Sequence, residues 1–122
     1  MKFCWSTLRV TDLERSIKFY EEIIGLSVAR RFPAGPGVEI AFLGDGETQI
    51  ELICIGAEKS VHAGDDISWG FEVDSLDAVL SLVKEKGIAV AGEPVQPNPS
   101  VRYFFIKDPD GMKIQIVENL AK

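Results

Sequence analysis

The sequence predicts an α+β fold of one domain in which two successive halves each run βαβββ. Two apolar stripes with helical spacing, each preceded by capping residues, alternate with short strand-like runs. The motif Val10-Thr-Asp-Leu13 recurs as Val73-Asp-Ser-Leu76, 63 residues later, and the runs 38–53 recur as 101–117 at an offset of 63 to 65. Chance similarity between two βα units is the alternative, but a repeat this long is typical of a duplicated half-domain. The 122 residues are enough to bury a core.

The first half is predicted to begin with a strand at 3–10, followed by a capping box at Thr11-Asp-Leu-Glu14 that starts a helix. Gly25 supplies a left-handed stop for this helix. Its apolar stripe consists of Leu13, Ile17, Tyr20 and Ile24. Three strands are expected to follow, at 26–33, 37–44 and 47–56.

The second half repeats this order after a polar linker at 57–66. A strand at 66–73 precedes a helix that begins near Ser75 and ends at Gly87, with a stripe of Leu76, Val79, Leu80 and Val83. The stretch 92–100 contains three prolines and is predicted to be a loop. The remaining strands are expected at 88–91, 101–107 and 112–118, so the modules are 1–56 and 67–122.

Alternation along these strands separates a face covered by the helix from a free face that can carry polar chemistry. In the first half the free face includes Trp5, Thr7, Arg9, Gln49, Glu51, Ile53 and Ile55. In the second half it includes Ser68, Gly70, Glu72, Lys113, Gln115 and Val117. The repeat makes two pairs of positions equivalent, Trp5 with Ser68 and Glu51 with Gln115. We therefore expect the functional site at these two pairs.

Composition excludes several classes of function. The net charge of −6 opposes nucleic-acid binding, because the cationic side chains are scattered except at Arg30-Arg31. An acidic surface could favour a cationic ligand, or it could simply keep the protein soluble. No apolar run is long enough for a membrane span, and no leader is expected at the N-terminus. Cys4 and Cys54 are interpreted as reduced core thiols, so the expected location is the cytoplasm.

Nearly the whole chain resembles the vicinal oxygen chelate superfamily, which includes glyoxalase I, extradiol dioxygenases, fosfomycin-modifying enzymes and bleomycin-resistance proteins. The resemblance depends on the order and spacing of several motifs: Leu8-Arg-Val-Thr-Asp-Leu13 with Ser16, Phe19 and Tyr20, then Gly25-Leu26, Ile50-Glu-Leu-Ile53, and Asp108-Pro-Asp-Gly111 leading into Lys113-Ile-Gln-Ile116. It implies that paired βαβββ modules build a cup in which four side chains hold a divalent metal. It also implies a homodimer, because the family usually pairs modules across subunits.

The resemblance places Trp5, Glu51, Ser68 and Gln115 at the four ligand positions. Glyoxalase I has His or Gln, Glu, His and Glu there, so only Glu51 is unchanged. Gln115 still offers a carbonyl oxygen, but indole cannot ligate a metal and neutral Ser68 is a poor ligand. Glu51 and Gln115 are therefore the metal ligands if Ni²⁺, Zn²⁺, Mn²⁺ or Fe²⁺ binds, and no cofactor is expected.

Two functions follow from the resemblance. The first is a metal-independent protein that binds a small molecule, with an aromatic wall of Trp5, Tyr103 and Phe105 near Phe42 or Phe32, and with Thr7, Arg9, Ser68, Glu51, Glu72 and Gln115 as polar contacts. The alternative is a glyoxalase I-like lyase in which Glu51 or Glu72 is catalytic and water or His62 completes the metal shell. The aromatic residues could also merely fill a cleft that has lost its metal.

Overall fold

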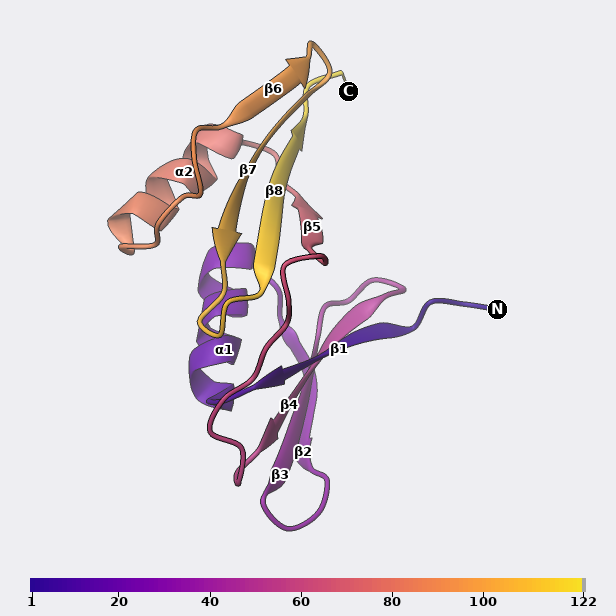
Figure 1. Ribbon diagram of the computed structural model, residues 1–122. Helices are drawn as coiled ribbons and strands as arrows, with labels where there is room; N and C mark the ends of the chain where they lie inside the picture. The colour runs from indigo at the N-terminus through magenta and orange to yellow at the C-terminus, as the bar shows by residue number, and fades with distance from the viewer. Residues whose placement is uncertain (122) are drawn as a thin grey trace. The chain divides into compact units, whose positions relative to one another are not determined.

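The computed structural model describes residues 1–121 as two compact units, one covering residues 1–63 and the other starting at Gly64. Each unit contains a four-stranded sheet and a helix, in the chain order βαβββ (Figure 1). The predicted α+β class is therefore confirmed. Within residues 1–121, no helix is long and apolar enough to cross a membrane.

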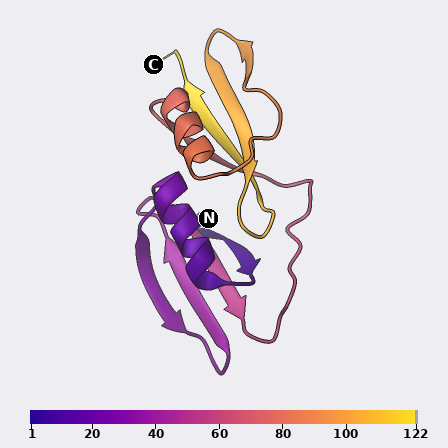
Figure 2. The same ribbon diagram turned by 90° about the vertical axis from the view of Figure 1, so that its left-hand side faces the viewer.

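The first sheet has the strand order β1-β4-β3-β2. Its strands are β1 (Trp5–Val10), β2 (Val28–Pro33), β3 (Val38–Leu43) and β4 (Gln49–Ile55). β1 runs parallel to β4, and the other two pairings are antiparallel. Helix α1 (Leu13–Phe19) packs against β3 and β4, where Ile50 and Leu52 are buried (Figure 2). The odd-numbered residues of β4 therefore lie on the face away from the helix.

The second sheet has the equivalent order β5-β8-β7-β6. Its elements are β5 (Trp69–Glu72), α2 (Leu76–Glu85), β6 (Val95–Asn98), β7 (Val101–Lys107) and β8 (Lys113–Asn119). β5 pairs with β8 in parallel, and the other two pairings are antiparallel. Helix α2 contacts β8, where Ile114 and Ile116 are buried. Gln115 consequently lies on the opposite face of β8.

Both helices have a side-chain N-cap, but the first one differs from the prediction. The carboxylate of Asp12 accepts a hydrogen bond from the backbone N–H of Arg15 at 3.1 Å, and the Thr11 hydroxyl accepts instead from the Arg15 guanidinium at 2.9 Å. Glu14 forms an ion pair with Arg31. The predicted capping box was therefore wrong, because an aspartate at the next position caps as well and the Glu14 carboxylate has a cationic partner on β2. In α2 the predicted start at Ser75 is correct, since its hydroxyl accepts from Ala78 N–H at 3.2 Å.

A π-helical segment, η1 (Tyr20–Ile24), follows α1 and ends at Gly25, whose φ of 86° is left-handed. The predicted stripe is buried at Leu13, Ile17 and Tyr20. Beyond Tyr20 the buried residue is Ile23, whereas Ile24 is only half-buried. The period of 3.6 residues that placed Ile24 in the core does not hold in a π-helical turn.

The region after α2 also differs from the prediction. Residues 88–91 form no strand, and the strand β6 lies instead inside the stretch 92–100 that was predicted to be a loop. β6 contains Pro97 and pairs irregularly with β7, through Val95 with Tyr103 and Asn98 with Val101. An edge strand tolerates proline because the missing N–H is not needed on its unpaired side.

The prediction that both cysteines lie in the core was also wrong. Cys4 is exposed, because β1 begins only at Trp5 and residues 1–4 precede the sheet. Cys54 is half-buried, and its thiol lies 3.6 Å from the carbonyl oxygen of Thr11. Both cysteines are free thiols.

Candidate functional site

A row of four side chains crosses the uncovered face of the first sheet. The strand register places Thr7 opposite Glu51, Glu51 opposite Phe42, and Phe42 opposite Arg30. Directly paired residues share a face, so this row runs from β1 through β4 and β3 to β2 on the side away from α1. It presents a hydroxyl, a carboxylate, an aromatic ring and a guanidinium in that order.

The polar end of the row is formed by Thr7 and Glu51. The Thr7 hydroxyl donates a hydrogen bond to one carboxylate oxygen of Glu51 at 2.5 Å. Glu51 is half-buried, whereas Thr7 is exposed. This hydrogen bond holds the Glu51 carboxylate on the sheet. The second carboxylate oxygen can accept a hydrogen bond from another donor.

The middle of the row is an aromatic platform that we define as Trp5, Phe32 and Phe42. The Trp5 ring meets Phe42 edge to face, with centroids 5.2 Å apart, and Phe32 stacks near Phe42 at 6.2 Å. The Arg30 guanidinium carbon lies 4.1 Å from the centroid of Phe42 and 5.7 Å from that of Phe32. Phe42 is buried by these neighbours, but Trp5 remains 45% exposed. Trp5 therefore still offers aromatic surface to a ligand.

Arg9 forms its ion pair outside this row. Its guanidinium bonds to Glu58, which follows β4. The side chain of Arg9 is 59% exposed, so it stays accessible from solvent.

The uncovered face of the second sheet carries an amide where the first carries a carboxylate. Gly70 lies opposite Gln115, and Gln115 lies opposite Phe105. A β-carbon built on Gly70 would be 3.5 Å from the side-chain oxygen of Gln115, so this amide rests beside bare backbone. The Lys113 amine lies 4.6 Å from the centroid of the Phe105 ring, and Tyr103 meets that ring edge to face at 5.7 Å. Cation and aromatic groups are therefore adjacent on this face as well.

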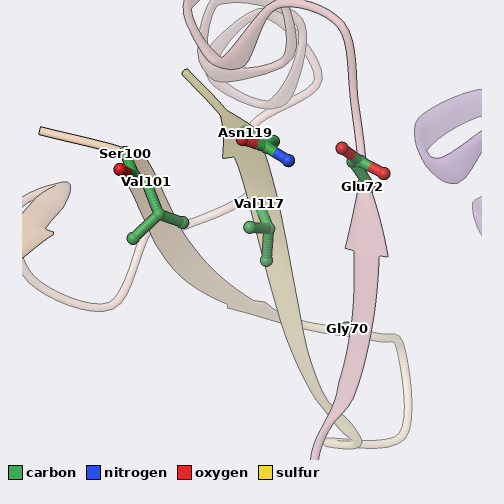
Figure 3. A pocket seen from close by; sticks show the side chains of 6 residues that line it. All are labelled: Gly70, Glu72, Ser100, Val101, Val117 and Asn119. Carbon is green, nitrogen blue, oxygen red and sulfur yellow. The ribbon is translucent and has the colours of Figure 1, made fainter. Parts of the chain in front are cut away.

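A hollow of about 510 Å³ lies on the same face (Figure 3). Its lining consists of Gly70, Glu72, Ser100, Val101, Val117 and Asn119. Glu72 is exposed at its rim, and Ser68, which precedes β5, is also exposed. Neither Asn119 nor Ser100 was among the predicted site residues. Alternation extended beyond Val117 would have found Asn119, but Ser100 reaches this face only through the hairpin of β6 and β7.

The residues at the family's ligand positions do not fit a divalent metal. Trp5 packs its ring against Phe42, and indole has no lone pair for a metal. Glu51 is the only charged group among the four, since Ser68 and Gln115 are neutral. Within residues 1–121, no three His, Cys, Asp or Glu side chains are grouped so that they could hold a metal ion. His62 is exposed.

Comparison with known proteins identifies the family. The model of the glyoxalase/bleomycin resistance protein/dioxygenase superfamily matches residues 3–116. The chain belongs to this superfamily. The predicted resemblance is thereby confirmed.

Individual members of the superfamily match over most of their length. A lactoylglutathione lyase of Haemophilus influenzae is 35% identical over 98% of this chain and 93% of its own length. A glyoxalase family protein from Bacillus cereus superposes with a TM-score of 0.86, at 25% identity over 99% of this chain and 95% of its own. Leishmania major glyoxalase I, which is trypanothione-dependent, has a TM-score of 0.84 at 24% identity over 97% of this chain and 86% of its own, which shows a shared fold.

Proposed function

We propose that this superfamily member binds a small organic molecule on the uncovered faces of its sheets, without a metal of the family type. The residues at the four metal-ligand positions of the family carry this proposal. Of the four ligand positions, Glu51 alone keeps an anionic donor, and Trp5 fills its position with an aromatic ring packed on Phe42. A site for Zn²⁺ or Ni²⁺ needs three or four N, S or carboxylate donors.

The composition of the two faces supports binding of an organic ligand. The first face combines the aromatic platform with the Thr7 hydroxyl and the Glu51 carboxylate. The second face combines Phe105 and Tyr103 with the amide of Gln115 and the hollow bordered by Glu72. Aromatic surface with a few convergent polar groups is the usual composition of a small-molecule site.

A lyase of the lactoylglutathione type is the second candidate, and the similarity to the Haemophilus influenzae enzyme favours it. An amide cannot accept a proton, so Gln115 could not act as a base and Glu51 or Glu72 would have to do so. Of the positions to which the resemblance assigns glutathione recognition, Arg9 keeps the arginine of the family, whereas Ile55 and Gly64 stand where the family has an asparagine and an arginine. Replacing Glu51 by alanine would then abolish turnover of hemithioacetals.

We also propose that the protein is a homodimer in the cytoplasm. The free thiols of Cys4 and Cys54 support a reducing compartment. Light scattering coupled to gel filtration should give the mass of two chains, and the mass of a single chain would contradict the dimer.

Elemental analysis tests the metal-free site first. The untagged protein is incubated separately with Ni²⁺, Zn²⁺, Mn²⁺ or Fe²⁺, passed through gel filtration, and assayed for metal and for hemithioacetal turnover. We expect far less than one metal per chain and no turnover. A stoichiometry near one, together with turnover that is lost in Glu51→Ala, would reject the proposal in favour of the lyase.

A ligand screen tests the binding function itself. With a chelator present, aromatic and cationic compounds should raise the melting temperature of the protein. Replacement of Trp5 by alanine should weaken the binding of the compounds found, because it removes the exposed part of the platform. If no compound in a broad library raised the melting temperature, the aromatic residues would only fill the face.

A further inference from the structure

The geometry of the first face points to the chemical class of its ligand. We infer that this face takes a zwitterionic molecule with a flat apolar middle, whose cationic end meets Glu51 and whose anionic end meets Arg30. The inference rests on the proposed function and adds the ligand class and a residue that determines specificity.

Opposite charges occupy the two ends of one row on the sheet. Glu51 on β4 and Arg30 on β2 are separated by a single strand, β3, which contributes Phe42 between them. Two strand spacings correspond to about 10 Å between the backbones of these residues. The Arg30 guanidinium carbon lies 4.1 Å from the centroid of the Phe42 ring, so its charge extends from β2 over the middle strand. One aromatic ring with a short charged arm on each side has a length of the same order as this backbone spacing.

Arg30 keeps its hydrogen-bond donors available. Within the described residues 1–121, its guanidinium contacts the faces of Phe42 and Phe32 and forms no ion pair or hydrogen bond with a protein group. Stacking on a ring uses the flat face of a guanidinium, while its five N–H groups lie in the plane and can hold a carboxylate by two bonds. Neighbouring Arg31 differs, because Glu39 and Glu14 occupy its N–H groups.

The other end of the row prefers a donor. The Glu51 carboxylate has one hydrogen bond from Thr7 and is half-buried, so an ammonium or hydroxyl group can bond to it at little cost in desolvation. A second anion would be repelled there. The direction of the ligand along the row is thus set by charge.

Three small probes share one aromatic ring and differ in their charged groups: 4-(aminomethyl)phenylacetate has both charges, its methyl ester has only the cation, and 4-methylphenylacetate has only the anion. Binding is followed by amide shifts of the ¹⁵N-labelled protein, which also report whether each variant is folded. For the wild type we expect the zwitterion to bind best, with shifts confined to strands of the first sheet.

The variants separate the two ends. Arg30→Gln should lower the affinity for the zwitterion and for the anion by roughly three- to tenfold, with no loss for the ester. Arg30→Lys should recover part of the loss because it restores the charge without the planar fork. Glu51→Gln should weaken the zwitterion and the ester instead. Arg102→Gln is the matched control, because this substitution removes the same charge from the second unit. Arg102 forms its ion pair with Asp77 of α2.

Several results would overturn the inference while leaving the proposed function intact. One is binding of the zwitterion to this face with equal affinity in wild type and Arg30→Gln. Another is an equal loss of affinity for the ester and for the zwitterion in Arg30→Gln, which would mean that the effect of Arg30 does not depend on the anionic end of the ligand. Absence of shifts on this face with any probe at millimolar concentration would also overturn it. The proposed function fails separately, if the chelator-containing screen yields no compound that stabilises the protein.

Discussion

Replacing Ser16 by alanine should stabilise the protein, although Ser16 is completely buried in α1. Its hydroxyl has no hydrogen-bond partner among the residues that the structure describes, and its relative exposure is 0%. Leaving a buried hydroxyl unpaired costs roughly 1 to 3 kcal/mol. Alanine removes that cost and leaves space for only one oxygen atom, which reduces the gain by about 0.5 kcal/mol.

The expected gain in the free energy of unfolding is about 1 kcal/mol, or roughly 3 to 5 °C in melting temperature for a chain of this size. Urea unfolding followed by circular dichroism measures the first quantity, and calorimetry the second. Ser81→Ala, at an exposed position of α2, is the control for the higher helix propensity of alanine, and its gain is subtracted. Ser75→Ala makes the same chemical change at the N-cap of α2 and should cost about 1 kcal/mol instead.

A corrected gain of zero or below for Ser16→Ala would refute this reasoning. It would mean that the Ser16 hydroxyl is paired or that the space left by its oxygen is more costly than the unpaired group. If Ser75→Ala also failed to destabilise the protein, neither the unpaired state of the Ser16 hydroxyl nor the hydrogen bond of the Ser75 hydroxyl would be supported.

Three further predictions concern the turn at Asp108, the ion pair of Arg31 with Glu39, and Gly70 on the second face. Asp108→Ala should lower the free energy of unfolding by roughly 2 to 4 kcal/mol, because the buried carboxylate accepts the backbone N–H groups of Asp110 and Met112 at 2.9 and 2.8 Å; a urea titration showing a loss below 1 kcal/mol would contradict this. The hydrogen bond from Arg31 lowers the pKa of Glu39, so its contribution to stability is present above the ordinary glutamate pKa and is lost as pH falls through the lowered value. The stability difference between wild type and Glu39→Gln should therefore shrink in acid, and a difference that is constant with pH would exclude this linkage. Gly70→Ala should fold with little change in melting temperature, since the new methyl group makes ordinary contact with Gln115, whereas a fall of more than about 5 °C would show that the site requires glycine.

The assignment of residues to faces could be predicted from the sequence because it requires only a local period of two. Buried Ile50 and Leu52 alternate with Glu51 in β4, and buried Ile114 and Ile116 alternate with Gln115 in β8. Such alternation is already visible in each strand as apolar and polar residues.

Features that depend on pairing partners could not be predicted in this way. The strand β6 is short, contains Pro97 and is held only by its neighbour β7, so its own composition indicates a loop. Arg9 pairs with Glu58, 49 residues away, because β1 lies parallel to β4. Arg30 was noted only as part of a cationic pair, although the step of two from Phe32 already placed it on the platform side. Its position opposite Phe42 depends on the register of the β2–β3 hairpin, which shifts between Val28 and Arg30.

The parallel pairing of β1 with β4 has a consequence for the order of assembly. Hairpin contacts between β2, β3 and β4 join segments that are close in the chain, whereas β1 can be held only after β4 has been made, some forty residues later. Closing that long loop is slow compared with forming the hairpins. During synthesis β1, which contains Trp5 and Thr7, therefore has no pairing strand until β4 with Glu51 has left the ribosome. The hydrogen bond between Thr7 and Glu51 forms only when this last strand joins the sheet, so one of the contacts of the site marks the completion of the first unit.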